Sequence, residues 1–370
     1  MTTQPTDASS EVPHTRSDPT PGLDLAAFGA WFLEHGPTGE DATWSGSLVP
    51  GGKSNLTYTV TDGTQEWIVR RPPLGHVQAT AHDMQREYRV MSALAETTVP
   101  VPQTVALCTD PDVMGAVFYV MEKVEGTPYR TVEELGRFSP ETTARLADGM
   151  VQVMAALHQV DPAAVALSDF GRPQGFLTRQ VSRWGRQLEG SRTRTLPDAE
   201  RLLRLLADTV PADDGERDPV SASIVHGDYR LDNLLSVPTD PNPVKAVVDW
   251  EMSTLGDPLT DLALLLVYDR VAGIVPALGV SDVSGAPGYP DAAQIVDRYA
   301  ELRALDADAL VHSLQFHLGL AHFKLAVILE GIHHRFVAGQ TVGTGFESIG
   351  EAVEPLLAAG LAFARGEETL

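Results

Sequence analysis

The sequence predicts an α+β protein with a small β-rich N-terminal lobe and a larger, mainly helical C-terminal lobe. Segments with strand periodicity are concentrated before about residue 121, and segments with helical periodicity dominate after it. A short β-hairpin is also predicted among the helices, at 233–248. The 370 residues suffice for two lobes and a sizeable core. The expected divisions are a tail at 1–22, an N-terminal lobe at 23–121 and a C-terminal lobe at 122–370.

The N-terminal lobe is predicted from a hairpin and one helix. Apolar residues alternate with threonine at 56–60, which is the period of a half-buried strand. Asp62 and Gly63 are typical of a two-residue turn, and 67–70 should form the return strand. Apolar residues at helical spacing predict a helix at 81–95. Further strands are predicted near 44–49, 103–107 and 117–121.

Helices are predicted for most of the remaining chain. Asp257 and Pro258 are typical of a helix start, because aspartate caps the first turn and proline fits its first position. The helix that follows should be strongly apolar, and a long helix is expected at 308–337. Other helical segments are predicted at 141–159 and 202–208.

Composition disfavours several classes of function. The formal net charge of −23 argues against nonspecific binding to nucleic acid or to anionic membranes, because like charges repel. The polar segment 1–22 is expected to be disordered and lacks the features of a signal peptide. No apolar run approaches the ~20 residues that a membrane helix needs. The single Cys108 is expected to be a buried small residue, and a cytoplasmic location is expected.

The strongest chemical signal lies at 226–233, which reads His-Gly-Asp-Tyr-Arg-Leu-Asp-Asn. Kinase catalytic loops place a catalytic aspartate five residues before a metal-binding asparagine, and Asp228 and Asn233 keep this interval. The predicted hairpin returns the chain beside Asn233, so Asp249 should face it. Because Mg²⁺ prefers hard oxygen ligands and keeps waters and phosphates, one amide and one carboxylate suffice. We therefore expect Asn233 and Asp249 to bind the metal and Asp228 to accept the proton of an attacking hydroxyl.

An alternative interpretation is that these are ordinary turn residues, since Asp, Asn and Gly populate turns widely. The interval, the hairpin and Asp249 together favour the catalytic interpretation. His226 is expected to order the loop rather than to act as a base. The predicted helix at 308–337 contains several histidines, but none are paired at the i, i+4 spacing of a helical zinc motif, so a metal site is not expected there.

The segment 226–233, together with Asp-Trp-Glu at 249–251, resembles the aminoglycoside-phosphotransferase and choline-kinase family. Other stretches are similar to the kinase-like domain associated with acyl-CoA dehydrogenases in animals and to its free-standing bacterial relatives. The resemblance covers about 51–337 and implies a protein-kinase-like two-lobed fold. It also implies transfer of the γ-phosphate of ATP to a small-molecule hydroxyl with Mg²⁺. The other stretches are Gly-Gly-Lys-Ser-Asn-Leu-Thr-Tyr at 51–58, Val-Arg-Arg-Pro-Pro at 69–73, Met-Glu-Lys-Val-Glu-Gly at 121–126 and Leu-Gly-Asp-Pro at 255–258.

The resemblance implies that the turn between the first two hairpin strands covers the nucleotide phosphates. Glycines there would let backbone N–H groups approach phosphate oxygens, with Lys53 and Ser54 as further donors. The kinase spacing G-x-G-x-x-G is absent, and an ordinary β-turn is the alternative interpretation. The residues concerned are Gly51, Gly52, Lys53, Ser54 and Asn55.

The family's phosphate-binding lysine is replaced by an arginine in the second hairpin strand, which leaves Arg70 and Arg71 as candidates. Arginine binds phosphate through its planar guanidinium group. Arg70 is preferred, because it alternates with Ile68 onto one strand face. Its implied partner is Glu87 in the helix at 81–95, and a surface carboxylate is the alternative interpretation of Glu87.

The resemblance assigns two further functions along the chain. The connection between the lobes should meet the adenine edge through its backbone, which places Glu122 and Val124 at the nucleotide. Asp261, one helical turn after Asp257, should hold the backbone of the catalytic loop and is therefore expected to have a structural role.

Two other classes of function were weighed. A protein kinase is disfavoured because the seven residues at 250–256 leave no room for the activation segment that docks a peptide. A nucleotide-binding pseudokinase scaffold is disfavoured because Asp228, Asn233 and Asp249 are all present; the arginine at position 70 is the one feature that favours it.

The acceptor stays open. The narrower resemblance implies a hydroxyacyl or acyl-CoA-like acceptor, and the family name implies an aminoglycoside. The apolar residues of the helix at 308–337, notably Phe316 and Phe323, favour an acyl chain if they line a pocket, but they fit a core-facing helix surface equally well. The preference for ATP over GTP and the oligomeric state are not predicted.

Overall fold

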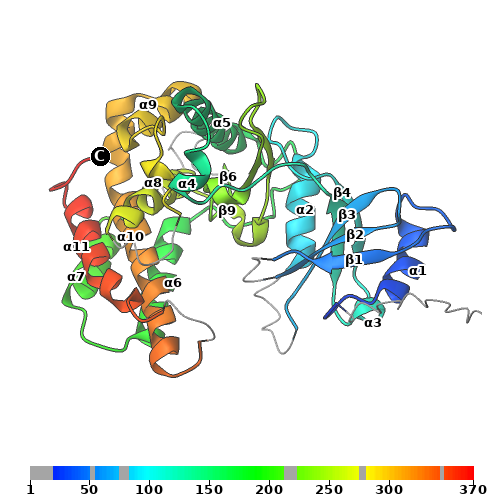
Figure 1. Cartoon of the computed structure of the whole chain (residues 1–370). Helices are drawn as coiled ribbons and strands as arrows, with labels where there is room; N and C mark the ends of the chain where they lie inside the picture. Colours follow the sequence, from blue (N-terminus) through cyan, green and yellow to red (C-terminus); the bar gives the residue numbers. More distant parts are fainter. Residues whose placement is uncertain (1–19, 51–54, 75–82, 212–222, 275–280, 342–345) are drawn as a thin grey trace, which may run out of the picture. The chain divides into compact units, whose positions relative to one another are not determined.

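The structure, a computed structural model, describes residues 20–50, 55–74, 83–211, 223–274, 281–341 and 346–370. It divides into two compact units, one from the described residues of 1–82 and 105–120 and the other from those of 83–104 and 121–370. Figure 1 shows a sheet-rich smaller unit and a mainly helical larger unit. The segment 83–104, expected in the N-terminal lobe, groups with the larger unit.

The smaller unit is organised around a five-stranded sheet in the order β1-β2-β3-β5-β4. Its predicted hairpin is present: β2 and β3 are antiparallel, with Val60 opposite Trp67. Asp62 closes the turn, because its carboxylate accepts hydrogen bonds of 2.8 Å from the backbone N–H groups of Thr64 and Gln65. The strands are β1 (Ser45–Leu48), β2 (Leu56–Thr61), β3 (Glu66–Arg71), β4 (Thr104–Cys108) and β5 (Phe118–Glu122).

A helix that was not predicted, α1 (Leu25–His35), completes the core of this unit. Asp24 caps it by accepting from the N–H groups of Ala26 and Ala27. Phe28 and Phe32 are fully buried and pack in one apolar cluster with strand residues such as Trp67. Figure 1 shows α1 and the short helix α3 (Pro111–Met114) beside the sheet. The predicted burial of Cys108 is confirmed: it is 2 % exposed and belongs to the same cluster.

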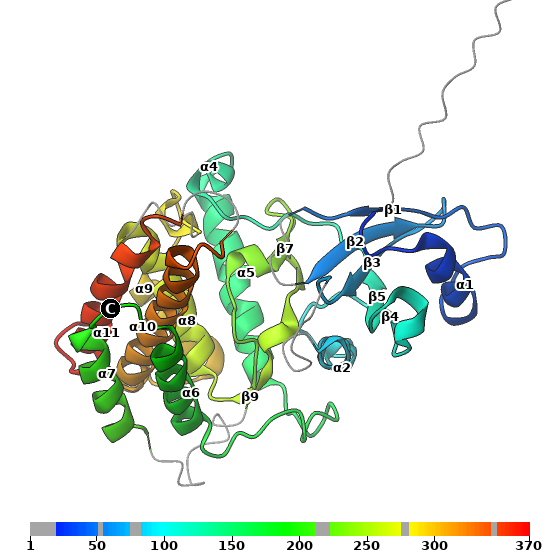
Figure 2. The same ribbon diagram turned by 90° about the horizontal axis from the view of Figure 1, so that it is seen from below.

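The larger unit is built around the long helix α10 (Ala307–Val337), which was predicted at 308–337. It packs against α6, α7, α8, α9 and α11, and Figure 2 shows α6, α10 and α11 side by side. No described helix is both long and apolar enough to cross a membrane. The other helices are α2 (Met84–Leu94), α4 (Val132–Leu135), α5 (Pro140–Gln159), α6 (Phe176–Ser191), α7 (Pro197–Asp208), α8 (Leu259–Ile274), α9 (Ala292–Arg303) and α11 (Val353–Ala364).

Helix α2 is fixed to the larger unit by Arg86. Its guanidinium lies 3.8 Å from the ring centre of Phe170 and donates to the backbone carbonyls of Phe170 and Ser253. Because α2 also packs against the short 3₁₀ helix Trp250–Met252, the predicted amphipathic helix lies next to the segment that follows Asp249.

Two short antiparallel strand pairs position the loops of this unit. The strand β6 (Ser223–Val225) pairs with β9 (Thr254–Gly256), and β7 (Leu234–Ser236) pairs with β8 (Val244–Val247). The predicted hairpin is therefore present, with strands slightly shorter than expected. Together the pairs hold both ends of 226–233 and both ends of 248–253.

Candidate active site

The backbone at the start of the loop 226–233 is hydrogen-bonded to the buried carboxylate of Asp261 in α8. One carboxylate oxygen accepts from the His226 N–H at 2.6 Å, and the other accepts from the Gly227 N–H at 2.8 Å. Gly227 has φ +86°, and a Cβ there would lie 2.7 Å from the Met252 carbonyl oxygen, so glycine is required. Asp261 therefore has the structural role that was expected.

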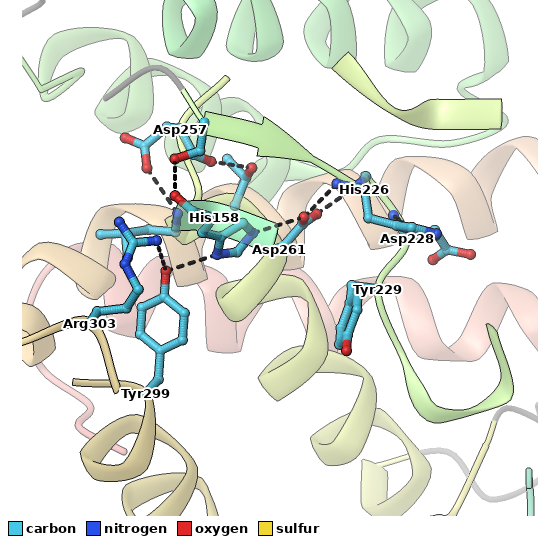
Figure 3. Close-up of polar contacts among 12 residues, drawn as sticks. His158, His226, Asp228, Tyr229, Asp257, Asp261, Tyr299 and Arg303 are labelled. Atoms are coloured by element: carbon cyan, nitrogen blue, oxygen red, sulfur yellow. Dashed lines mark hydrogen bonds and ion pairs between the residues drawn. The ribbon is translucent and has the colours of Figure 1, made fainter. Parts of the chain in front are cut away.

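Figure 3 shows the Asp261 carboxylate between this loop and the ring of His158 in α5. The His158 Nε2 lies 3.3 Å from Asp261, and its Nδ1 lies 2.8 Å from the Tyr299 hydroxyl. Burial raises the pKa of Asp261, but its hydrogen bonds and the neighbouring histidines lower it more, so the net shift is downward. Burial lowers the pKa of His158, and the Asp261 carboxylate opposes this shift. The loop is thus anchored to a fully buried ionised carboxylate.

His226 orders the loop, as predicted. Its Nε2–H donates to the Val248 carbonyl at 3.0 Å, and its Nδ1 accepts from the Asp228 N–H at 3.2 Å. The ring is fully buried and packs against Trp250. Because both ring nitrogens have backbone partners, His226 is unsuited to act as a base.

The Asp228 side chain is held from two sides and is still accessible. The Asn233 Nδ2 donates to the Asp228 carbonyl at 2.8 Å and to its Oδ2 at 3.2 Å. The Arg230 Nε also lies 3.4 Å from the Asp228 Oδ2. The Asp228 side chain is 22 % exposed, and in Figure 3 its carboxylate points away from the His158–Asp261 cluster. This is the arrangement that a positioned base needs.

The two predicted metal ligands are brought together by the β7–β8 hairpin. The Val248 N–H donates to the Asn233 carbonyl at 2.9 Å. Asp249 directly follows Val248, so this hydrogen bond brings the backbone at Asp249 close to Asn233. The Asn233 Nδ2 donates a hydrogen bond to Asp228, so the amide oxygen of Asn233 is the atom that can bind a cation. An amide oxygen and a carboxylate fit Mg²⁺. No group of three His, Cys, Asp or Glu side chains in the described residues is arranged to hold a metal.

Asp249 has an unusual backbone conformation. Its φ of 68° and ψ of 55° are in the left-handed region, which few residues other than glycine, asparagine and aspartate adopt. Such conformations are concentrated at functional sites. The turn directs the chain from β8 into the 3₁₀ helix Trp250–Met252.

Sequence reasoning missed Lys324, which lies in the middle of α10. Its Nζ donates to the Gly227 carbonyl at 2.9 Å and lies 5.7 Å from the ring centre of Trp184. Burial lowers the pKa of the ammonium group, while Asp228 and Asp261 oppose this shift. Lys324 is 97 residues from its partner, so no local pattern could reveal the contact.

We expect Lys324→Met to lower kcat about 10-fold or more without lowering the melting temperature. Methionine fills the same space without the cost of burying a charge, whereas the loop loses a charged hydrogen bond of about 1.5–3 kcal/mol. Steady-state kinetics and thermal unfolding would be compared with His334→Leu, an exposed position on the same helix. Unchanged kcat would show that Lys324 has no part in positioning the loop.

In the smaller unit the structure distinguishes the two arginine candidates. Arg71 is 5 % exposed, and its guanidinium donates to the carbonyls of Gly22 and Met114 at 2.7 Å. The Arg71 guanidinium is therefore engaged by backbone carbonyl groups within its own unit. Arg70 alternates to the opposite face of β3 together with Ile68, which supports the preferred choice.

The other predicted nucleotide residues are placed as follows. Gly51, Gly52, Lys53 and Ser54 lie outside the described residues, and Asn55 is 3 % exposed. Glu87 is 1 % exposed, so the interpretation as a surface carboxylate is wrong. Glu122 ends β5, and its N–H donates to the Gln103 carbonyl at 2.8 Å. The Glu122 N–H is thus already engaged, and Val124 follows in the connection after β5.

The apolar surface of α10 proves to be mainly core-facing. Phe323 is fully buried, so the suggestion that it lines an acceptor pocket is wrong. Phe316 is 9 % exposed and borders a cavity of about 630 Å³ that also contacts Asp257 and His312. Asp228 is not among the described residues that line this cavity.

Together these features define a protein of kinase-like fold, with a sheet-rich unit, a helical unit and a catalytic-type loop followed by a hairpin. The chain belongs to the phosphotransferase enzyme family, whose model matches residues 45–295. The predicted fold class and family resemblance are confirmed.

Individual relatives agree with this assignment. The human acyl-CoA dehydrogenase family member 11 is 31 % identical over 321 residues, which cover 87 % of this chain and 40 % of that protein. The chain thus spans about two fifths of the length of the curated relatives it matches. A putative aminoglycoside phosphotransferase from Ralstonia eutropha is 34 % identical, with a TM-score of 0.78 over 93 % of this chain and 98 % of that one. The GDP complex of aminoglycoside 2′-phosphotransferase-IIIa, at 15 % identity and a TM-score of 0.59 over 92 % and 99 % of the two chains, shares the fold.

Proposed function

We propose that this phosphotransferase transfers the γ-phosphate of ATP to a hydroxyl of a small molecule in a Mg²⁺-dependent reaction. The observation that carries the proposal is the placement of Asp228, whose accessible carboxylate is contacted by Asn233 and Arg230. A carboxylate held in this way can accept the proton of an attacking hydroxyl. Phosphoryl transfer otherwise requires mainly positioning and charge neutralisation.

In this proposal Asn233 and Asp249 hold the Mg²⁺. The ion's chemical contribution is to neutralise negative charge on the phosphate oxygens. Asp261 and Lys324 keep the loop backbone in place, so that Asp228 faces the acceptor rather than the buried cluster.

The nucleotide phosphates would be bound by Arg70, with Glu87 orienting its guanidinium, and by the turn at 51–55. The Glu122 carbonyl and the Val124 backbone would meet the adenine edge.

For the acceptor, a hydroxyacyl or acyl-CoA-like compound is the first candidate. The match to acyl-CoA dehydrogenase family member 11 supports it. The second candidate is an aminoglycoside, which the name of the Ralstonia eutropha relative supports. A pseudokinase would bind ATP without turnover.

Release of ADP from ATP, or of GDP from GTP, measured with and without Mg²⁺, tests the proposal. The acceptor panel should contain hydroxyacyl compounds of increasing chain length and kanamycin-like amines, each at low and high ionic strength. An apolar pocket gains about 0.8 kcal/mol per buried CH₂, so KM should fall with chain length. Strongly salt-sensitive turnover of the amines alone would favour the aminoglycoside. ATP binding without acceptor-dependent ADP release would overturn the proposal.

A further inference from the structure

Two arginines lie beside Asp228 in the larger unit. The Nε of Arg230 is 3.4 Å from the Asp228 Oδ2 and 3.1 Å from the Asp232 Oδ1, and its guanidinium lies 4.8 Å from the ring centre of Tyr268. The Nε of Arg130, from the segment before α4, is 3.6 Å from the other Asp232 oxygen. Asp232 therefore contacts both guanidinium groups, and Arg230 also contacts the proposed base.

In these contacts each guanidinium group faces the carboxylates with its Nε atom. Both arginines approach carboxylates through Nε, and no hydrogen bond from the terminal Nη atoms of either reaches another described residue. The Arg130 side chain is 53 % exposed and that of Arg230 is 24 % exposed, so both are accessible. A guanidinium has five N–H donors in a planar arrangement that matches carboxylate and phosphate oxygens. The pair is thus suited to an anion.

The same cluster is poorly suited to a polycation. A binding pocket for ammonium groups needs accessible carboxylates, but the Asp232 side chain is 5 % exposed and is covered by the two arginines. Asp228 is reserved for the reacting hydroxyl. Because Asp232 is buried, an ammonium group at the accessible edges of the pair would meet guanidinium groups rather than that carboxylate.

We propose that Arg130 and Arg230 bind an acidic group of the acceptor, a carboxylate or a phosphate, and thereby place its hydroxyl at Asp228. The inference rests on the proposed function and specifies the acceptor as a hydroxylated anion. A carboxylate and a phosphate both offer anionic oxygen atoms to a guanidinium group. The phosphates of the nucleotide do so as well. The test must therefore distinguish an acidic group of the acceptor from the phosphates of the nucleotide.

The test uses three alcohols of the same chain length that differ at the far end: γ-hydroxybutyrate, its neutral amide and the corresponding aminobutanol. The coenzyme A thioester of the acid adds a phosphate source. The full-length protein is assayed for ADP release, and binding of each compound is measured by calorimetry in the presence of ADP and Mg²⁺. The variants are Arg130→Gln and Arg230→Gln, with Arg201→Gln as the control, because its side chain is 58 % exposed and pairs with Asp198 on the surface of α7.

The wild type should bind the acid or its thioester at least about 10-fold more tightly than the amide, and the aminobutanol least. Arg130→Gln should remove most of this preference, the size expected for losing charge-assisted hydrogen bonds, and should leave binding of the amide and KM for ATP unchanged. Arg230→Gln should have the same effect on binding and should also lower kcat, because Arg230 contacts Asp228 directly. Dependence of the thioester alone on Arg130 would identify phosphate as the acidic group.

Equal binding of acid, thioester and amide, or an unchanged preference in both variants, would overturn the inference. A rise in KM for ATP without an effect on the acid would assign the pair to nucleotide phosphates and would also overturn it. If the binding preference is found but no compound releases ADP, the proposed phosphotransfer is contradicted and the anion site is retained. Turnover of the acid and of the neutral amide by the wild type with the same KM would support the phosphotransfer and contradict the anion site.

Discussion

Replacing Asp249 with alanine is expected to abolish phosphotransfer and to remove the Mg²⁺ dependence of ATP binding. The reason is the position of Asp249 directly after β8, beside the contact between the Val248 N–H and the Asn233 carbonyl. Without this carboxylate the Asn233 amide would be the one remaining protein ligand, which is insufficient for a cation that keeps most of its waters. Titrating ATP by calorimetry with and without Mg²⁺ measures the effect directly.

Two further variants separate loss of the ligand from distortion of the backbone. The left-handed conformation of Asp249 is unfavourable for alanine but tolerated by asparagine, so Asp249→Asn should lose activity with little change in stability. Asp240→Ala alters an aspartate in the connection between β7 and β8 that pairs with Lys245 at 2.8 Å, and it should retain wild-type activity. A wild-type response to Mg²⁺ in Asp249→Ala would place the ligand elsewhere.

Local sequence patterns were sufficient to predict several elements of the fold. The alternation at 56–60, the Asp62–Gly63 turn and the cap at Asp257 each depend on a few neighbouring residues, and each is found in the structure. The same holds for the hairpin after Asn233, since strand length and turn composition are local properties. Elements of this kind are stabilised by short-range geometry that a single sequence displays.

Other elements gave weaker signals. Helix α6 begins after Gly175, which is in the left-handed conformation and provides no capping side chain, so its start is hidden in the sequence. Helix α1, by contrast, has a cap at Asp24 and apolar residues Phe28 and Phe32 one turn apart, and these signals were overlooked. The start of α6 therefore has no signal in the sequence, whereas α1 has signals that were given too little weight.

The side chains around Asp228 were the least predictable part of the site. Lys324, Arg130 and Tyr268 reach the catalytic loop from α10, from the segment before α4 and from α8. Their places depend on how these helices pack, and packing is not encoded in periodicity. Likewise, Arg70 and Arg71 could not be fully separated before the carbonyl partners of Arg71 were known.

Asp228→Asn should lower kcat by at least ~10²-fold and leave ATP affinity nearly unchanged, the size expected when a positioned base is lost. Asparagine has the shape of aspartate, and the hydrogen bond from the Asn233 Nδ2 to the backbone carbonyl at 228 does not involve the replaced group, so the loop should keep its conformation. The amide, however, cannot take the proton of an attacking hydroxyl. Steady-state kinetics and calorimetric ATP binding would be measured beside Asp198→Asn, a surface aspartate of α7 paired with Arg201. Since the buried Asp261 cluster remains intact, the melting temperature should change little, and a large fall would mean that lost activity reports misfolding. Near-normal turnover in a folded Asp228→Asn protein would show that the acceptor's proton leaves by another route, and that the spacing of Asp228 and Asn233 serves the structure of the loop rather than its chemistry.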